Sequence, residues 1–245
     1  METKSERAAV DVDGQAMHAY LARPEQAGSY PGVLLCMEVF GVNAHVRSVA
    51  DRVAAEGYVV LAPDLFHRTG PGVELGYDEE GLAKGIELMT QVRADELIAD
   101  LAAAHGALRA RPDTTERIGA MGFCFGGHAA YLAAATLPVA ATASFYGGGI
   151  AGPAPGGTGP STLDRTPSIQ GRILCLFGEN DDYIPADQVA AIRARLEESS
   201  IDHDVVVYPG VGHGFFCDAR PDYDEAAATD AWSRVTGLFA SELAD

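Results

Sequence analysis

Positive charge is scarce in this 245-residue chain, which has 17 Lys and Arg residues against 35 Asp and Glu residues and a formal net charge of −18. A protein this acidic repels nucleic-acid phosphates and anionic membrane surfaces, so we expect neither as a partner. The chain also lacks an apolar run long enough to span a membrane, and its first seven residues lack the apolar core of a signal peptide. We therefore expect a cytoplasmic protein that acts on a small molecule, as a monomer or a small homo-oligomer.

Cysteine is also sparse, with four residues at positions 36, 124, 175 and 217. They form no C-x-x-C pair and have no metal-ligand spacing, so we expect no metal, and no motif indicates a cofactor. Cys36 and Cys175 lie within apolar runs that are typical of buried strands. Unpaired thiols are typical of a reducing compartment, which would also preserve a reactive thiol.

Apolar runs alternate with helical patterns along most of the chain. The runs that we expect to form strands are 8–13, 15–22, 32–37, 58–62, 117–121, 139–146, 172–177 and 203–208. The segments that we expect to form helices are 43–56, 128–137, 187–199 and 222–243. This alternation predicts a single α/β domain over residues 1–245, with a mostly parallel sheet between helices on both faces. The Asp13-Gly14 turn adds an antiparallel hairpin at the N-terminus.

Two segments fit this alternation less well. Residues 78–109 have a long helical pattern, which we expect to be broken near Gly81 or Gly85. Residues 147–171 are rich in glycine and proline and join two strands without a clear helix. A loop of this length is typical either of a lid over a pocket or of a flexible insertion.

The segment 122–127, Gly-Phe-Cys-Phe-Gly-Gly, joins a strand-like run to a helical one. A Gly-x-Cys-x-Gly turn from strand to helix has the form of a nucleophile elbow, in which small residues permit a sharp turn that exposes the central side chain. Here that side chain is the thiol of Cys124. The same pattern also fits a buried strand–helix junction in which the cysteine only fills space.

Side chains that could assist a thiol nucleophile follow two later strands. Such a nucleophile needs a base and a group that orients the base, and α/β-hydrolases carry nucleophile, acid and histidine in that order along the chain. His213 follows the last strand, and Glu179, Asp181 and Asp182 follow the strand before it. Because the carboxyl ends of parallel strands meet at one edge of a sheet, we expect His213 and one of these carboxylates to lie near Cys124.

Four segments together resemble the dienelactone hydrolases (carboxymethylenebutenolidases), which are α/β-hydrolases. The segments are 37–43 (Met-Glu-Val-Phe-Gly-Val-Asn), 122–127, 180–185 (Asn-Asp-Asp-Tyr-Ile-Pro) and 212–215 (Gly-His-Gly-Phe). The resemblance implies a hydrolase of small carboxylic esters or lactones that acts through a thioester acyl-enzyme, with Cys124, Asp181 and His213 as its triad. Asp181 is favoured among the carboxylates because it precedes Pro185 by four residues, as the family's acid does.

The resemblance also implies a role for Glu38, which in the family contacts the cysteine and helps to deprotonate it when substrate arrives. Attack of the thiolate on an acyl carbon creates an oxyanion. We expect the backbone N–H groups of Phe125 and Val39 to bind it.

The chain departs from the family pattern where arginines hold a carboxylate of the substrate. Cys217 stands where one of these arginines is expected, and Arg220 could substitute for it. No residue of 81–88 clearly matches a second. The aromatic residues that could line the pocket are Phe40, Tyr77, Phe145 and Tyr146, although scattered aromatics more often belong to a core. Two alternatives stay open: the same fold acting on thioesters or haloacids, and a non-catalytic hydrolase-fold protein that senses a ligand or redox state.

Overall fold

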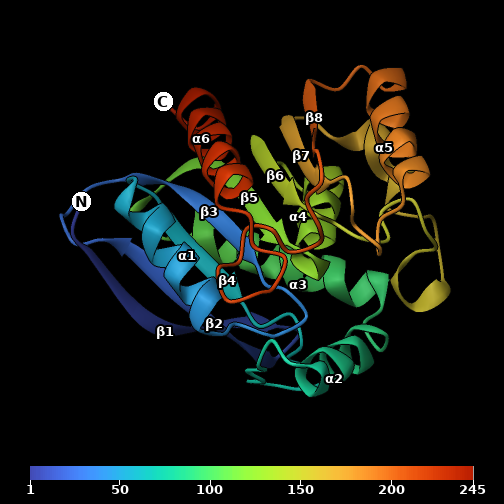
Figure 1. Ribbon diagram of the computed structural model, residues 1–245. Coiled ribbons are helices and arrows are strands. Elements are labelled where there is room, and N and C mark those ends of the chain that lie inside the picture. The colour runs from blue at the N-terminus through green and yellow to red at the C-terminus, as the bar shows by residue number, and fades with distance from the viewer. Residues whose placement is uncertain (245) are drawn as a thin grey trace.

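Eight strands form one sheet in the computed structural model, which describes residues 1–244 (Figure 1). The strands are β1 (Thr3–Val12), β2 (Gln15–Pro24), β3 (Tyr30–Cys36), β4 (Val59–Pro63), β5 (Thr114–Phe123), β6 (Ala141–Phe145), β7 (Arg172–Gly178) and β8 (His203–Tyr208). The helices are α1 (Ala44–Ala55), α2 (Glu79–Met89), α3 (Ala94–Arg109), α4 (Phe125–Thr136), α5 (Ala186–Glu198) and α6 (Glu225–Glu242), with two short 3₁₀ turns, η1 (Pro155–Gly157) and η2 (Leu163–Ser168).

The strand order is β1-β2-β4-β3-β5-β6-β7-β8. The pairs β1–β2 and β2–β4 are antiparallel, and all the later pairs are parallel. At the first hairpin, Asp13 and Gly14 have φ values of 52° and 81°, which an Asp-Gly pair adopts readily. The structure therefore confirms the predicted α/β-hydrolase architecture, a mostly parallel sheet that begins with an antiparallel hairpin.

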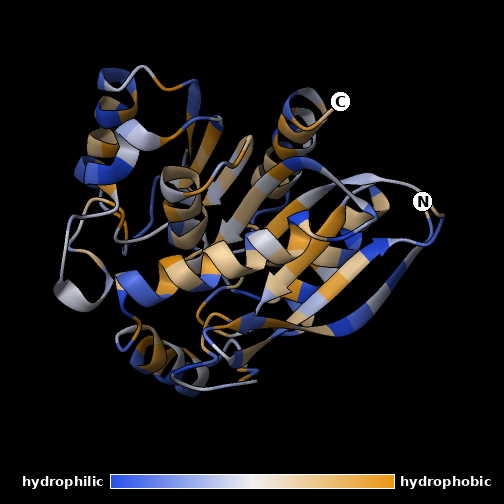
Figure 2. Cartoon of the chain, turned by 180° about the vertical axis from the view of Figure 1, so that it is seen from behind, coloured by the Kyte–Doolittle hydropathy of each residue, from blue (hydrophilic) through white to orange (hydrophobic). Residues whose placement is uncertain are grey.

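Helices cover both faces of the sheet. The helices α3 and α4 pack against each other on one face, while α1 and α6 lie on the other (Figures 1 and 2). Every residue of β4 and β6 is buried, as expected of central strands that are covered on both sides. Figure 2 shows the resulting hydrophobic strands between the helical layers. None of the helices within residues 1–244 combines the length and the apolar composition needed to cross a membrane.

The predicted break of the 78–109 helix at a glycine was wrong. The segment forms α2 and α3, and the chain leaves the helix after Met89 instead. Gly85 stays within α2, where a Cβ atom would lie 2.3 Å from the carbonyl oxygen of Val39. Here the missing side chain permits a close approach of α2 to the backbone of Val39, rather than ending the helix.

The segment 147–171 folds back on α4. The ring of His128 in α4 accepts a hydrogen bond at Nε2 from the hydroxyl of Thr162 (2.6 Å) and donates at Nδ1 to the carbonyl of Gly148 (2.8 Å). The hydroxyls of Tyr131 and Thr166 lie 2.8 Å apart. These contacts attach the segment 147–171 to α4, the helix that follows Cys124. The action of the segment as a lid stays a prediction.

Candidate active site

Cys124 occupies a sharp turn between β5 and α4. Its φ and ψ angles are 55° and −117°, a conformation that residues other than glycine rarely adopt. A Cβ atom on Gly122 would lie 2.1 Å from the carbonyl oxygen of Gly126, and one on Gly126 would lie 2.1 Å from that of Cys36. The turn therefore requires glycine on both sides. It leaves Cys124 partly exposed, whereas Cys36 is fully buried.

His213 and Asp181 form a buried pair. The imidazole Nδ1 donates a hydrogen bond to Oδ2 of Asp181 at 2.7 Å, because a carboxylate can only accept. The second oxygen of Asp181 accepts from the backbone N–H of Tyr183 at 2.9 Å. Asp182 and Glu179 are exposed, so Asp181 is the carboxylate of the three that contacts the histidine. This pairing leaves Nε2 of His213 available to a second partner.

Electrostatics link this pair to Cys124. Burial acts to lower the pKa of His213, but the negative charge and hydrogen bond of Cys124, together with those of Asp181, outweigh burial and raise the pKa to about 10. A thiolate and an imidazolium stabilise each other in this way. The structure thus brings Cys124, Asp181 and His213 together from the carboxyl ends of β5, β7 and β8.

Glu38 is fully buried beside this group and makes two hydrogen bonds. Its Oε1 accepts from the guanidinium of Arg220 at 3.1 Å, and its Oε2 accepts from the hydroxyl of Tyr77 at 3.1 Å. The side chain of Arg220 is only 9% exposed, and its guanidinium lies 5.6 Å from the ring centre of Phe40. In the structure, Glu38 is therefore paired with the cation of Arg220, and neither of its two hydrogen bonds goes to Cys124.

The two backbone amides expected to bind an oxyanion have no protein acceptor. Within residues 1–244, the N–H groups of Val39 and Phe125 donate no hydrogen bond to backbone or side chain. Phe125 is the first residue of α4, and the first N–H groups of a helix have no acceptor within the helix. Both amides are therefore available to a ligand.

Tyr146 also lies against His213. Its ring centre is 5.0 Å from that of His213, and its φ of 37° is strained for a residue other than glycine. Burial, reinforced by the charge of Glu38, raises the pKa of its hydroxyl well above the ordinary value. Among the described residues this hydroxyl has no hydrogen-bond partner. Tyr146 is fully buried, so its role as a substrate contact stays a prediction.

Asn43 contributes to the site in a way that the sequence analysis missed. It caps α1 as expected, with Oδ1 accepting from the N–H of Val46 at 3.2 Å. Its Nδ2 also donates to the hydroxyl of Tyr77 at 3.1 Å, which holds that hydroxyl toward Glu38. A capping pattern gives no sign of this second contact, since Tyr77 lies in an irregular loop far along the chain.

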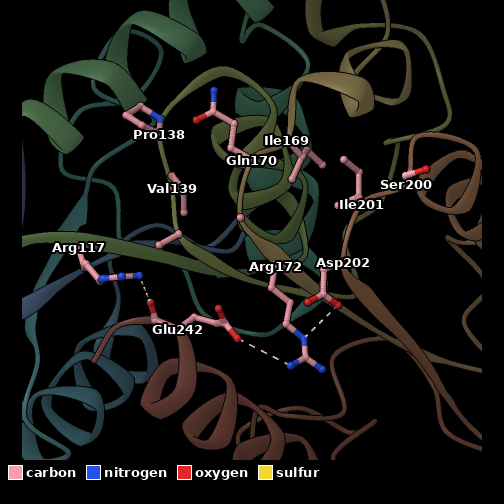
Figure 3. A pocket seen from close by; sticks show the side chains of 12 residues that line it. Arg117, Pro138, Val139, Ile169, Gln170, Arg172, Ser200, Ile201, Asp202 and Glu242 are labelled. Carbon is pink, nitrogen blue, oxygen red and sulfur yellow. Dashed lines mark hydrogen bonds and ion pairs between the residues drawn. The ribbon is translucent and has the colours of Figure 1, made fainter. Parts of the chain in front are cut away.

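A hollow of about 560 Å³ lies at the opposite edge of the sheet (Figure 3). It adjoins the amino ends of β6 and β7 and the end of α6. The cations there are already paired: Arg117 donates to the carbonyl of Glu242 at 3.0 Å, and Arg172 lies 3.7 Å from Asp202 and 3.9 Å from the carboxylate of Glu242. None of the predicted catalytic side chains lines this hollow.

Comparison with known proteins gives consistent matches over nearly the whole chain. The family model described as "Dienelactone hydrolase family" matches residues 17–243. A Synechocystis sp. protein named "Putative carboxymethylenebutenolidase" is 44% identical over 225 residues, which cover 91% of each chain. A protein of the same name from Salmonella typhimurium is 33% identical and covers 93% of this chain and 83% of its own.

A solved structure agrees with these matches. The crystal structure named "Putative Dienelactone Hydrolase" from Klebsiella pneumoniae is 30% identical and superimposes with a TM-score of 0.88. The match covers 98% of this chain and 99% of that one. The similarity in sequence and in structure therefore includes every segment that contributes to the site.

Proposed function

Because the chain belongs to the dienelactone hydrolase family and is a hydrolase of that type, we propose that it cleaves small carboxylic esters or lactones with Cys124 as the nucleophile. The observation that carries this proposal is the convergence of three side chains at one sheet edge. Cys124 stands in a strained elbow, and His213 beside it is oriented by Asp181 at 2.7 Å. This is the arrangement that nucleophilic acyl transfer requires.

In the first step, the Cys124 proton passes to Nε2 of His213, which forms the thiolate–imidazolium pair, and the sulfur anion of this pair attacks the acyl carbon. The carbonyl π bond opens, and its electron pair moves to the oxygen. The free N–H groups of Val39 and Phe125 bind this oxyanion. Removing one such donor typically costs about 3 kcal/mol of transition-state stabilisation.

In the second step, the oxyanion reforms the carbonyl and the ester C–O bond breaks. The departing alkoxide receives the proton from His213, and in a lactone it stays attached to the acyl group. His213 then takes a proton from water, the hydroxide attacks the thioester, and the thiolate leaves. Asp181 keeps Nδ1 protonated throughout, so that Nε2 is the atom that exchanges protons.

Arg220 supplies a reason for preferring substrates that carry a carboxylate. Since the protein has a net charge of −18, an anionic substrate needs a local cation to bind. Arg220 is such a cation, and Glu38 is its partner in the free protein. A substrate carboxylate that pairs with Arg220 would release Glu38, which could then accept the Cys124 proton in place of His213. In this scheme the substrate itself activates the nucleophile.

The experiment that tests the proposal compares two cysteine variants on an activated ester such as p-nitrophenyl acetate. We expect Cys124→Ala to abolish turnover. Cys175→Ala, which removes a buried thiol in β7, should retain it. Turnover by the Cys124→Ala variant would contradict the proposal. A panel of lactones, thioesters and haloacids then tests the substrate class. Faster turnover of a thioester or haloacid would favour that alternative, and a wild type that cleaves none of the panel would favour a non-catalytic sensor.

A further inference from the structure

Three side chains beside the active site form a cluster that the proposed reaction does not use. A ring nitrogen of His45 in α1, the sulfur of Cys217 and a carboxylate oxygen of Asp218 lie within 4.8 Å of one another. Nδ1 of His45 is 3.8 Å from Oδ1 of Asp218. Imidazole, thiolate and carboxylate are the donors that Zn²⁺ prefers in proteins. We propose that this cluster binds a divalent transition-metal ion such as Zn²⁺.

The imidazole of His45 is buried without the hydrogen bonds that a buried imidazole normally makes. Its side chain is only 9% exposed, and Nε2 has no hydrogen-bond partner within residues 1–244. The rings of Tyr77, Phe123 and Phe216 surround it at centroid distances of 6.1–6.5 Å. The ring atom nearest Asp218 is Nδ1, which also makes no hydrogen bond within residues 1–244, so a ring protonated at Nε2 would present the lone pair of Nδ1 to an ion.

The charges of the cluster balance those of a divalent ion. On binding, the S–H bond of Cys217 breaks, a metal–sulfur bond forms, and the proton passes to the solvent. The resulting thiolate and the Asp218 carboxylate neutralise the two positive charges, while His45 contributes the lone pair of a neutral ring. Three protein donors leave a fourth tetrahedral position for water.

The cluster is open to solvent on one side. The side chain of Asp218 is 79% exposed, whereas Cys217 is fully buried. A surface hollow of about 500 Å³ is lined by His45 and Asp218, together with Tyr77 and Ser48. An ion can therefore reach the cluster from this hollow, and the exposed Asp218 can move to close the coordination shell. His45 lies far from Cys217 and Asp218 in the sequence, which is why cysteine spacing gives no sign of the cluster.

The site is connected to the proposed catalytic machinery through one hydroxyl. The hydroxyl of Tyr77 interacts with the thiol of Cys217 and donates its proton to Oε2 of Glu38. A cation at Cys217 would place positive charge near Glu38 and weaken it as a proton acceptor. We therefore expect the ion to slow turnover, a consequence that rests on the proposed function, whereas the binding itself does not.

The binding test uses Co²⁺ as a spectroscopic probe in the full-length Cys124→Ala variant, which removes the nucleophilic thiol as a competing ligand. We expect one equivalent of Co²⁺ to give a cobalt–thiolate charge-transfer band, and Zn²⁺ to displace it. Adding Cys217→Ser should abolish the band, and adding Asp218→Asn should weaken binding more than about tenfold. Adding Cys175→Ser is the matched control and should change neither the charge-transfer band nor the affinity for Co²⁺.

Two results would overturn the site: no thiolate band in the Cys124→Ala variant, or an unchanged band after Cys217→Ser. Because Asp218 is exposed, Asp218→Asn tests the site even if a change at the buried Cys217 impairs folding. Inhibition tests the connection separately. Zn²⁺ should slow the wild type reversibly, with EDTA restoring turnover, and should slow Asp218→Asn far less. Equal inhibition of the wild type and Asp218→Asn would overturn the link between the metal site and turnover. A wild type without esterase activity would contradict the proposed function, but the Co²⁺ titration would still decide whether the metal site exists.

Discussion

The two edges of the central sheet differ in how deeply their charged side chains are buried. At the carboxyl edge, Glu38, Asp181 and His213 are each less than 10% exposed. At the amino edge, Arg172 is 35% exposed and pairs with carboxylates that are themselves partly exposed, Asp202 and Glu242 among them (Figure 3). Solvent screens the ion pairs of the amino edge, so they contribute little to stability. Burial strengthens each electrostatic contact at the carboxyl edge. The size of a hollow therefore says less about function than the desolvation of the charges beside it.

The largest difference between the two edges should appear when one carboxylate at a time is changed on the carboxyl edge. We expect Asp181→Asn to lower kcat/KM for an activated ester by roughly a thousandfold to ten-thousandfold, because the amide no longer fixes the tautomer of His213. The matched control is Asp182→Asn, which changes an exposed neighbour and should leave kcat/KM within about twofold. Similar losses in both variants would show that the buried pair has no special role.

The Glu38–Arg220 pair allows a test of the buried charges by stability. Arg220→Met leaves Glu38 buried without its cation, so we expect the free energy of unfolding to fall by about 3 kcal/mol in denaturant titrations. The double variant Glu38→Gln/Arg220→Met should recover much of that loss. By contrast, Arg172→Met on the amino edge should change stability by about 1 kcal/mol or less. Additive losses in the double variant would mean that the two side chains do not interact.

The protonation of His213 reports on the charge of Cys124 beside it. NMR titration should give a pKa near 10 for His213 in the wild type. In Cys124→Ala the pKa should fall, because the charge that raises it is gone. A folded-state pKa above the unfolded value of about 6.5 stabilises the protein fully below pH 6.5, and this contribution is lost as the pH rises through 10. The wild type should therefore lose more stability than Cys124→Ala between pH 7 and 10, and equal losses would contradict the thiolate–imidazolium pair.

The smallest expected effect concerns the attachment of the 147–171 segment. Thr162→Val removes the hydroxyl that donates to Nε2 of His128, and we expect it to lower the free energy of unfolding by about 1–2 kcal/mol. Ser161→Ala is the control, because the Ser161 hydroxyl bonds an exposed carboxylate, that of Asp164. If the segment also acts as a lid, Thr162→Val should change KM as well. An unchanged KM would favour a purely structural attachment.

The local features of the site were predictable from the sequence because each depends on a short pattern. The elbow at Cys124 requires only small neighbours between a strand and a helix, and His213 follows the last strand directly. The choice of Asp181 over Asp182 and Glu179 needed the family resemblance, since all three follow the same strand. Only its burial in the structure shows which carboxylate reaches the imidazole.

The contacts that depend on distant segments were not predictable. Arg220 was expected to bind a substrate, but its pairing with Glu38 joins residues 182 positions apart. Gly81 and Gly85 look like helix breakers in the sequence alone, because nothing there shows that another stretch of backbone passes within reach of them. The cluster of His45, Cys217 and Asp218 likewise forms only when α1 meets the loop after β8. Such contacts follow from packing rather than from local pattern.

The identity of the nucleophile is tested most directly by mass spectrometry of enzyme quenched during turnover of an activated ester. The account predicts one acyl group per chain, located on the peptide that contains Cys124 and absent from the Cys124→Ala variant. An acyl group on another residue, or steady turnover with no acyl-enzyme at any quench time, would contradict it.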